Sequence, residues 1–86
     1  MTTMIVTHEV NDVKHWLSSP KRKELFGPMG ITFKIFVDPA GSNLVGGVLD
    51  IPDMAAFQKF MQTQTAADAM KFDGVRPETM KMLVAS

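Results

Sequence analysis

Hydrophobic and polar residues alternate along several segments of the chain, and this alternation predicts β-strands. Residues 31–38, ITFKIFVD, place Ile and Phe side chains on one face and mainly Thr and Lys on the other, the period-two pattern of a half-buried strand. Residues 4–10, 43–51 and 78–85 alternate or are rich in β-branched residues, which also favours strands. The turn-forming sequence PAGSN at 39–43 predicts that the second and third strands form a hairpin.

Residues 12–26 show helical spacing instead. Asn11 or Asp12 can cap the start of this segment, because short polar side chains accept hydrogen bonds from the first free backbone N–H groups. The apolar stripe at i, i+3 and i+4 consists of Val13, Trp16 and Leu17. The sequence SSP at 18–20 predicts an interruption, with a helical restart at the proline.

A second helical segment is expected over residues 53–72. Its start lies near Asp50 or Asp53, and Thr63 or Thr65 offers a new cap at which the helix breaks and resumes. The apolar face comprises Met54, Phe57, Phe60 and Met61.

The resulting order is β-α-β-β-α-β, which predicts an α+β, ferredoxin-like fold: a four-stranded antiparallel sheet with two helices on one face. At 86 residues the chain is expected to form one domain over residues 1–86 with a thin core. The face away from the helices is mixed and comprises Thr7, Glu9, Lys34, Phe36, Val48, Lys81 and Leu83. This face is too apolar to remain in water, so we expect a homodimer in which a second sheet covers it. Glu9 and Lys81 are expected on neighbouring strands, where they would compensate each other.

The amino-acid composition restricts the classes of partner and cofactor that we expect. Nine basic and nine acidic residues cancel, which argues against the electrostatic attraction that nucleic acids and anionic membranes require. The chain has no cysteine and no recognisable metal-ligand spacing, so no metal or other cofactor is expected. No stretch reaches the length of a membrane span and no secretory leader is seen, which favours a cytoplasmic protein.

Two longer motifs resemble a known superfamily. VTHEVNDVKHWL at 6–17 is similar to the VxHxVxDYDxWL opening of short dimeric α/β barrel proteins related to antibiotic-biosynthesis monooxygenases, and AFQKFMQTQTAADAMKFDGVRPE at 56–78 resembles their second helix. The resemblance implies two sheets packed face to face in a dimeric barrel, with a ligand pocket inside each monomer between sheet and helices. Val13 stands where a Tyr is common, and the first helical segment is unusually basic. Reactions differ widely among such proteins, so the fold by itself implies no single reaction.

His8 is the candidate catalytic residue. It alternates with Val6 and Val10, so its side chain should point toward the helices, where a neutral imidazole with a pKa of about 6.5 suits general-base chemistry on a phenol or activated methylene. A hydrogen-bonded core histidine is the alternative. The candidate ligand-binding residues are Trp16, Phe33 and Phe57, which also suit a core.

Two further groups of polar residues are interpreted as surface features. His15 is expected on the helix surface in a charge pair with Asp12, three residues earlier. The basic cluster Lys21, Arg22 and Lys23 is interpreted as a solvated face rather than an anion site.

Three functions therefore remain open. The first is a barrel that binds a small apolar or aromatic metabolite and acts on it without a cofactor, as a monooxygenase or cyclase. The second is a non-catalytic ligand-binding or regulatory module. The third is a structural dimer whose pocket is filled by its own side chains.

Overall fold

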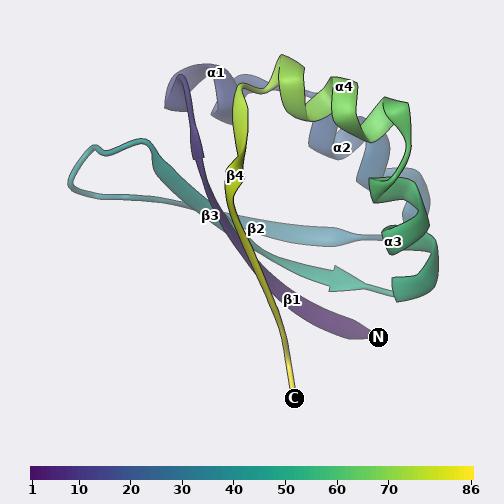
Figure 1. Cartoon of the computed structure of the whole chain (residues 1–86). Helices are drawn as coiled ribbons and strands as arrows, with labels where there is room; N and C mark the ends of the chain where they lie inside the picture. Colours follow the sequence, from purple (N-terminus) through teal and green to yellow (C-terminus); the bar gives the residue numbers. More distant parts are fainter.

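The computed structural model describes residues 1–86, which form a sheet with all the helices on one of its faces (Figure 1). The strands are β1 (Thr2–Val10), β2 (Thr32–Val37), β3 (Leu44–Ile51) and β4 (Val75–Val84). The helices are α1 (Val13–Ser18), α2 (Lys21–Phe26), a 3-10 turn (Gly27–Met29), α3 (Met54–Met61) and α4 (Gln64–Phe72). The sheet is antiparallel with the order β2-β3-β1-β4. The predicted ferredoxin-like fold is confirmed.

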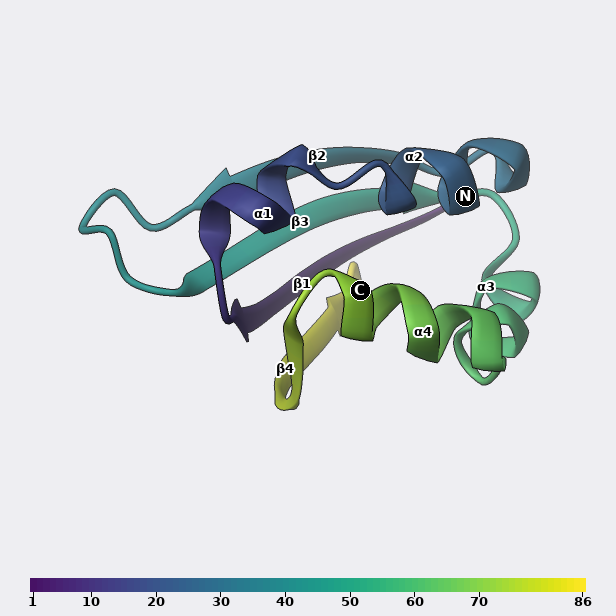
Figure 2. The same ribbon diagram turned by 90° about the horizontal axis from the view of Figure 1, so that it is seen from above.

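Each of the two predicted helical regions is a pair of short helices: α2 restarts after Pro20 without a side-chain cap, whereas a new cap starts α4. Asp12 Oδ1 accepts from His15 N at 3.2 Å and Asp53 Oδ1 accepts from Ala56 N at 3.0 Å, which starts α1 and α3. Thr63, rather than Thr65, caps α4 by accepting from the backbone N–H of Ala66. The breaks produce two bent arms, α1–α2 and α3–α4, which lie over different parts of the sheet (Figure 2).

Strand β4 begins earlier than predicted and contains a bulge. Glu9 lies opposite Arg76 whereas Thr7 lies opposite Lys81, so two steps along β1 correspond to five along β4. Inside the bulge, Thr79 Oγ1 accepts from the backbone N–H of Glu9 at 2.8 Å. The bulge brings Arg76 Nη1 to 3.0 Å from the Glu9 carboxylate. The predicted partner Lys81 is therefore wrong, and Arg76 forms the ion pair.

The interior contains two groups of buried side chains. One comprises Met4, Ile31, Leu49, Ile51 and Phe57, and the other comprises Val10, Trp16 and Val45. Leu17, predicted to be buried beside Trp16, is 49% exposed, because consecutive residues of a helix point about 100° apart and α1 turns Trp16, rather than Leu17, toward the sheet.

The sheet face away from the helices carries exposed apolar side chains. Strand register places Leu83 opposite Ile5 and Phe36 opposite Gly46 on this face, as predicted for the mixed face. The large apolar residues exposed there are Ile5, Phe36, Leu44 and Leu83. Nothing else in the chain covers them (Figure 1). Among the helices, none has the length and apolar character that crossing a bilayer requires.

Candidate functional site

A cavity of about 120 Å³ lies between the sheet and the two helical arms, and it opens to solvent on one side. Of its 23 lining residues, 17 are hydrophobic. The four predicted site residues, His8, Trp16, Phe33 and Phe57, all line this cavity. An engineered cavity of about 150 Å³ in another protein binds benzene, so this space is of the order of a single aromatic ring.

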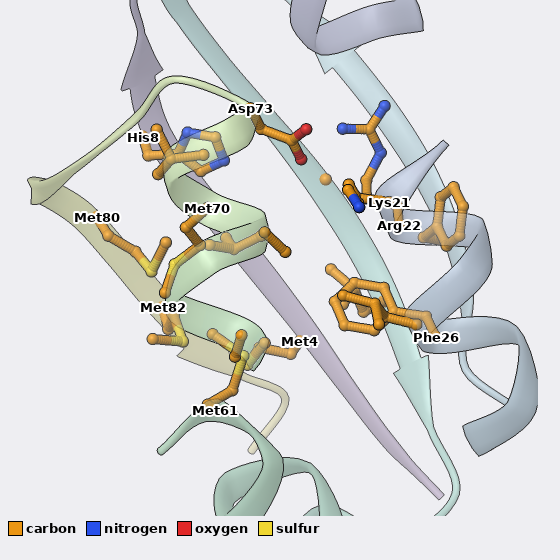
Figure 3. A pocket seen from close by; sticks show the side chains of 18 of the residues that line it. Met4, His8, Lys21, Arg22, Phe26, Met61, Met70, Asp73, Met80 and Met82 are labelled. Carbon is orange, nitrogen blue, oxygen red and sulfur yellow. The ribbon is translucent and has the colours of Figure 1, made fainter. Parts of the chain in front are cut away.

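The apolar walls differ in character. On one side Phe26 packs edge-on to Phe33, with ring centroids 6.3 Å apart, and at a tilt to Phe57, with centroids 6.1 Å apart. On the other side lie five methionines, Met4, Met61, Met70, Met80 and Met82 (Figure 3). Because aromatic rings are rigid and methionine adapts its shape, one wall of the cavity is rigid and the other is adaptable.

His8 extends from β1 into one end of the cavity and is only 6% exposed. Its ring stands edge-on to Trp16, with centroids 5.7 Å apart. Nδ1 lies 3.5 Å from the carbonyl oxygen of Glu9. A carbonyl can only accept, so this long contact favours the tautomer with the proton on Nδ1 and a lone pair on Nε2. Nε2 has no hydrogen-bond partner in the chain and is available to a ligand.

Burial lowers the pKa of His8 below 6.5, because desolvation disfavours the imidazolium. The contact with the Glu9 carbonyl opposes this effect, the charge of Arg22 adds to it, and the charge of Asp73 opposes it. At neutral pH His8 is therefore a neutral hydrogen-bond acceptor that can take a proton.

Arg22 reaches the same end of the cavity from α2. Its guanidinium carbon lies 4.3 Å from the centroid of the Trp16 ring, and Nη2 donates to the Trp16 carbonyl oxygen at 2.9 Å. Nε and Nη1 are buried without a partner. Burial lowers the pKa of Arg22, and Asp73 partly opposes this. The prediction of a solvated Arg22 is thus wrong: α2 begins immediately after Pro20 and folds this side chain back onto α1.

Asp73, the C-cap of α4, is the third polar residue at this end and is 6% exposed. Its Oδ1 is buried without a partner, and it makes no salt bridge with Arg22, which faces it from the other arm (Figure 3). Sequence reasoning missed Asp73, because the DG pair at 73–74 has the appearance of an ordinary helix stop.

His15 lies outside the cavity. The predicted charge pair with Asp12 is wrong. The Asp12 carboxylate accepts from the backbone N–H of His15, whereas Nε2 of the His15 ring lies 2.7 Å from the Phe72 carbonyl oxygen. The side chain thus ties α1 to the end of α4, next to Asp73. No group of three or more His, Cys, Asp or Glu side chains is placed to hold a metal ion.

Neither a protein-family model nor a curated protein matches the sequence, but solved structures share its fold. An antibiotic biosynthesis monooxygenase is 15% identical with a TM-score of 0.65, the alignment covering 100% of this chain and 97% of the other. A dimeric ferredoxin-like protein of unknown function from Jannaschia sp. CCS1 is 14% identical with a TM-score of 0.66, over 99% and 97% of the two chains. A Pseudomonas aeruginosa protein is 17% identical with a TM-score of 0.60, over 98% and 90%. The resemblance found in the sequence is thereby confirmed at the level of architecture: this chain has the ferredoxin-like fold of the antibiotic biosynthesis monooxygenase structure.

Proposed function

We propose that this protein binds a small, largely apolar or aromatic molecule in the cavity, and that His8 takes a proton from an acidic hydroxyl or activated methylene group of that molecule. The reaction class would be cofactor-free, of the oxygenase or cyclase kind. One observation supports the proposal. The apolar cavity is of the order of a single aromatic ring, and at one end it is lined by His8, Arg22 and Asp73, several of whose polar atoms have no hydrogen-bond partner.

The physical argument concerns what would satisfy these groups. A buried polar atom without a hydrogen bond costs about 1–3 kcal/mol, and more when it is charged. Proteins retain such groups mainly where a ligand or water completes them. A ligand with an apolar ring and one polar substituent would fill the cavity and complete its polar end together.

Proton transfer also suits this geometry. The ligand O–H or C–H bond breaks, its proton joins Nε2 of His8, and the electron pair stays on the ligand. The resulting anion lies at the end of the cavity that contains Arg22, and the imidazolium lies near Asp73. A low-dielectric site strengthens both attractions.

We also propose that two copies pair through the exposed sheet face to form a dimeric barrel. Leu83 is 68% exposed and Phe36 is 48% exposed on that face, and monomers seldom leave large contiguous apolar patches in water. The structurally similar Jannaschia protein is dimeric. The arrangement supports the proposal because it covers the mixed face and leaves the cavities, on the opposite side of each sheet, separate.

A direct test uses Trp16, the only tryptophan, as a fluorescent probe in the cavity wall. Titration with phenol and 4-methylphenol should quench its emission saturably and raise the melting temperature. His8→Gln should weaken binding about tenfold through the lost hydrogen bond, whereas His15→Gln, outside the cavity, should bind like the wild type. If neither compound changes the emission or the melting temperature, the proposal is wrong for this ligand class.

A non-catalytic ligand-binding module is the second candidate function. The observation that favours it is the 3.5 Å separation between His8 Nδ1 and the Glu9 carbonyl oxygen, which holds a base only loosely. Saturable binding with no proton exchange at the carbon next to a ligand carbonyl, followed by NMR in deuterated water, would support this second function.

A further inference from the structure

We propose that Arg22 and Asp73 act as a separated charge pair between which the ligand's hydroxyl group lies: Arg22 binds its oxygen, and Asp73 is a positioning residue that stabilises His8 once His8 has taken the proton. The inference rests on the proposed function and assigns roles to two residues beyond His8.

Arg22 is held before any ligand arrives. Its guanidinium stacks on Trp16 at 4.3 Å and donates through Nη2 to the Trp16 carbonyl at 2.9 Å. Two contacts to one residue restrict a side chain that is otherwise costly to order. Nε and Nη1 remain unpartnered, so the guanidinium has hydrogen-bonding capacity left for an oxygen atom.

Asp73 is nine-tenths buried, lines the cavity and also lacks a partner at Oδ1. Arg22 is only partly buried, yet its Nε and Nη1 atoms and Oδ1 of Asp73 are shielded from solvent, and opposite charges in such a place would normally form an ion pair, because unpaired buried charges are strongly destabilising. Here no nitrogen–oxygen pair between Arg22 and Asp73 comes within 4.0 Å. The two residues belong to different helical arms, which hold the charges apart on either side of the cavity (Figure 3).

A hydroxyl group fits between such charges because it accepts from a cation and donates to an anion or to a neutral imidazole. The groups that face His8 are the Glu9 carbonyl on β1, Trp16 on α1, Arg22 on α2 and Asp73 after α4. Lys21 also lines the cavity, but its ammonium group lies 5.2 Å from the Phe72 ring centroid.

The charge balance explains why both residues are needed. Before the transfer, neutral His8 leaves one positive and one negative charge at this end of the cavity. After the transfer, the ligand anion faces Arg22 and the imidazolium faces Asp73, so the net charge is unchanged while each new charge gains an opposite neighbour. Removal of either residue leaves one new charge uncompensated in a largely apolar space.

The first test needs no ligand. Titration of the His8 ring is followed by NMR, and its signals are assigned by their loss in His8→Gln. Arg22→Gln should raise the titration midpoint, because a nearby cation is removed, and Asp73→Asn should lower it, because a nearby anion is removed. The matched controls are Lys23→Gln on α2 and Asp68→Asn on α4, which make the same charge changes at exposed positions and should leave the midpoint unchanged.

The second test uses 4-nitrophenol, whose anion and neutral form differ in visible absorption. Binding to the wild type should increase the fraction of anion, and Arg22→Gln should weaken binding about tenfold and remove that increase, whereas Arg22→Lys should retain part of both. Circular dichroism establishes that each variant is folded. If Arg22→Gln does not fold, the shift of the His8 titration midpoint in Asp73→Asn, compared with that in Asp68→Asn, decides the test.

The outcomes separate this inference from the proposed function. Opposite shifts of the His8 midpoint without any binding of 4-nitrophenol would support the electrostatic roles and contradict the ligand class. Binding without shifts of the midpoint in either variant would support the cavity as a ligand site and overturn the roles of Arg22 and Asp73.

Discussion

Filling the cavity should stabilise the protein and abolish ligand binding. The position to change is Ala69 on α4, whose side chain lines the cavity and is only half-buried. An empty cavity costs about 24 cal/mol per Å³ in large-to-small core substitutions, so the full 120 Å³ corresponds to at most about 3 kcal/mol. Because this cavity opens to solvent and Leu adds only three carbon atoms to Ala, we expect Ala69→Leu to raise the free energy of unfolding by about 1–2 kcal/mol.

The assay is urea unfolding followed by Trp16 fluorescence, at one fixed protein concentration because an associating protein is more stable when concentrated. Ala67→Leu is the matched control, since it makes the same substitution on the same helix at an exposed position and reports the difference in helix propensity. In a domain of this size 1 kcal/mol corresponds to about 4–8 °C in melting temperature. Phenol should no longer quench Trp16 in Ala69→Leu and should still quench it in Ala67→Leu.

A loss of stability in Ala69→Leu relative to Ala67→Leu would refute this reasoning. It would mean that the Phe and Met side chains already fill the space and that Leu overpacks it. That result would favour a structural dimer without a ligand site. A gain in stability with unchanged ligand binding would instead place the ligand elsewhere.

Three further predictions follow from the same structure. Leu83→Lys puts a charge on the exposed sheet face, at its most exposed apolar residue, and should convert the dimer into a monomer in light scattering; a dimer of unchanged mass would contradict the proposed interface. His8 has a pKa of about 6.5 in the unfolded chain and a lower pKa in the folded protein, so the unfolded state takes up the proton first as the pH falls. The free energy of unfolding should therefore fall as the pH drops below about 6.5 and level off below the folded pKa. Urea titrations in which His8→Gln shows the same decline would show that another group causes it. Asp53→Ala removes the cap of α3 and should cost about 1 kcal/mol, measured by thermal unfolding; an unchanged melting temperature would show that packing alone positions this helix.

Local sequence patterns determined most of the architecture. The turn sequence PAGSN between two strand patterns predicted the hairpin of β2 and β3. Strand alternation directed His8 toward the helices, because side chains on a strand point to opposite faces in turn. Helical spacing brought Trp16 and Phe57 into the interior, and both line the same cavity as His8. Phe36 and Leu83 were also found exposed on the outer sheet face, where the alternation placed them, whereas Ile5 and Leu44 on the same face were not predicted.

The polar end of the cavity was decided by tertiary structure alone. Arg22 belongs to a run of basic residues with the appearance of a solvated surface, and Asp73 belongs to a helix stop fifty-one positions later in the chain. No helical or strand periodicity in the sequence relates Arg22 to Asp73, because their proximity depends on how the two bent helical arms cross the sheet. The bulge in β4 is a similar case: it replaces Lys81 by Arg76 as the partner of Glu9, through a change of register between strands at opposite ends of the chain. Local patterns determine which way a side chain points, whereas only packing between distant segments determines which charges it meets there.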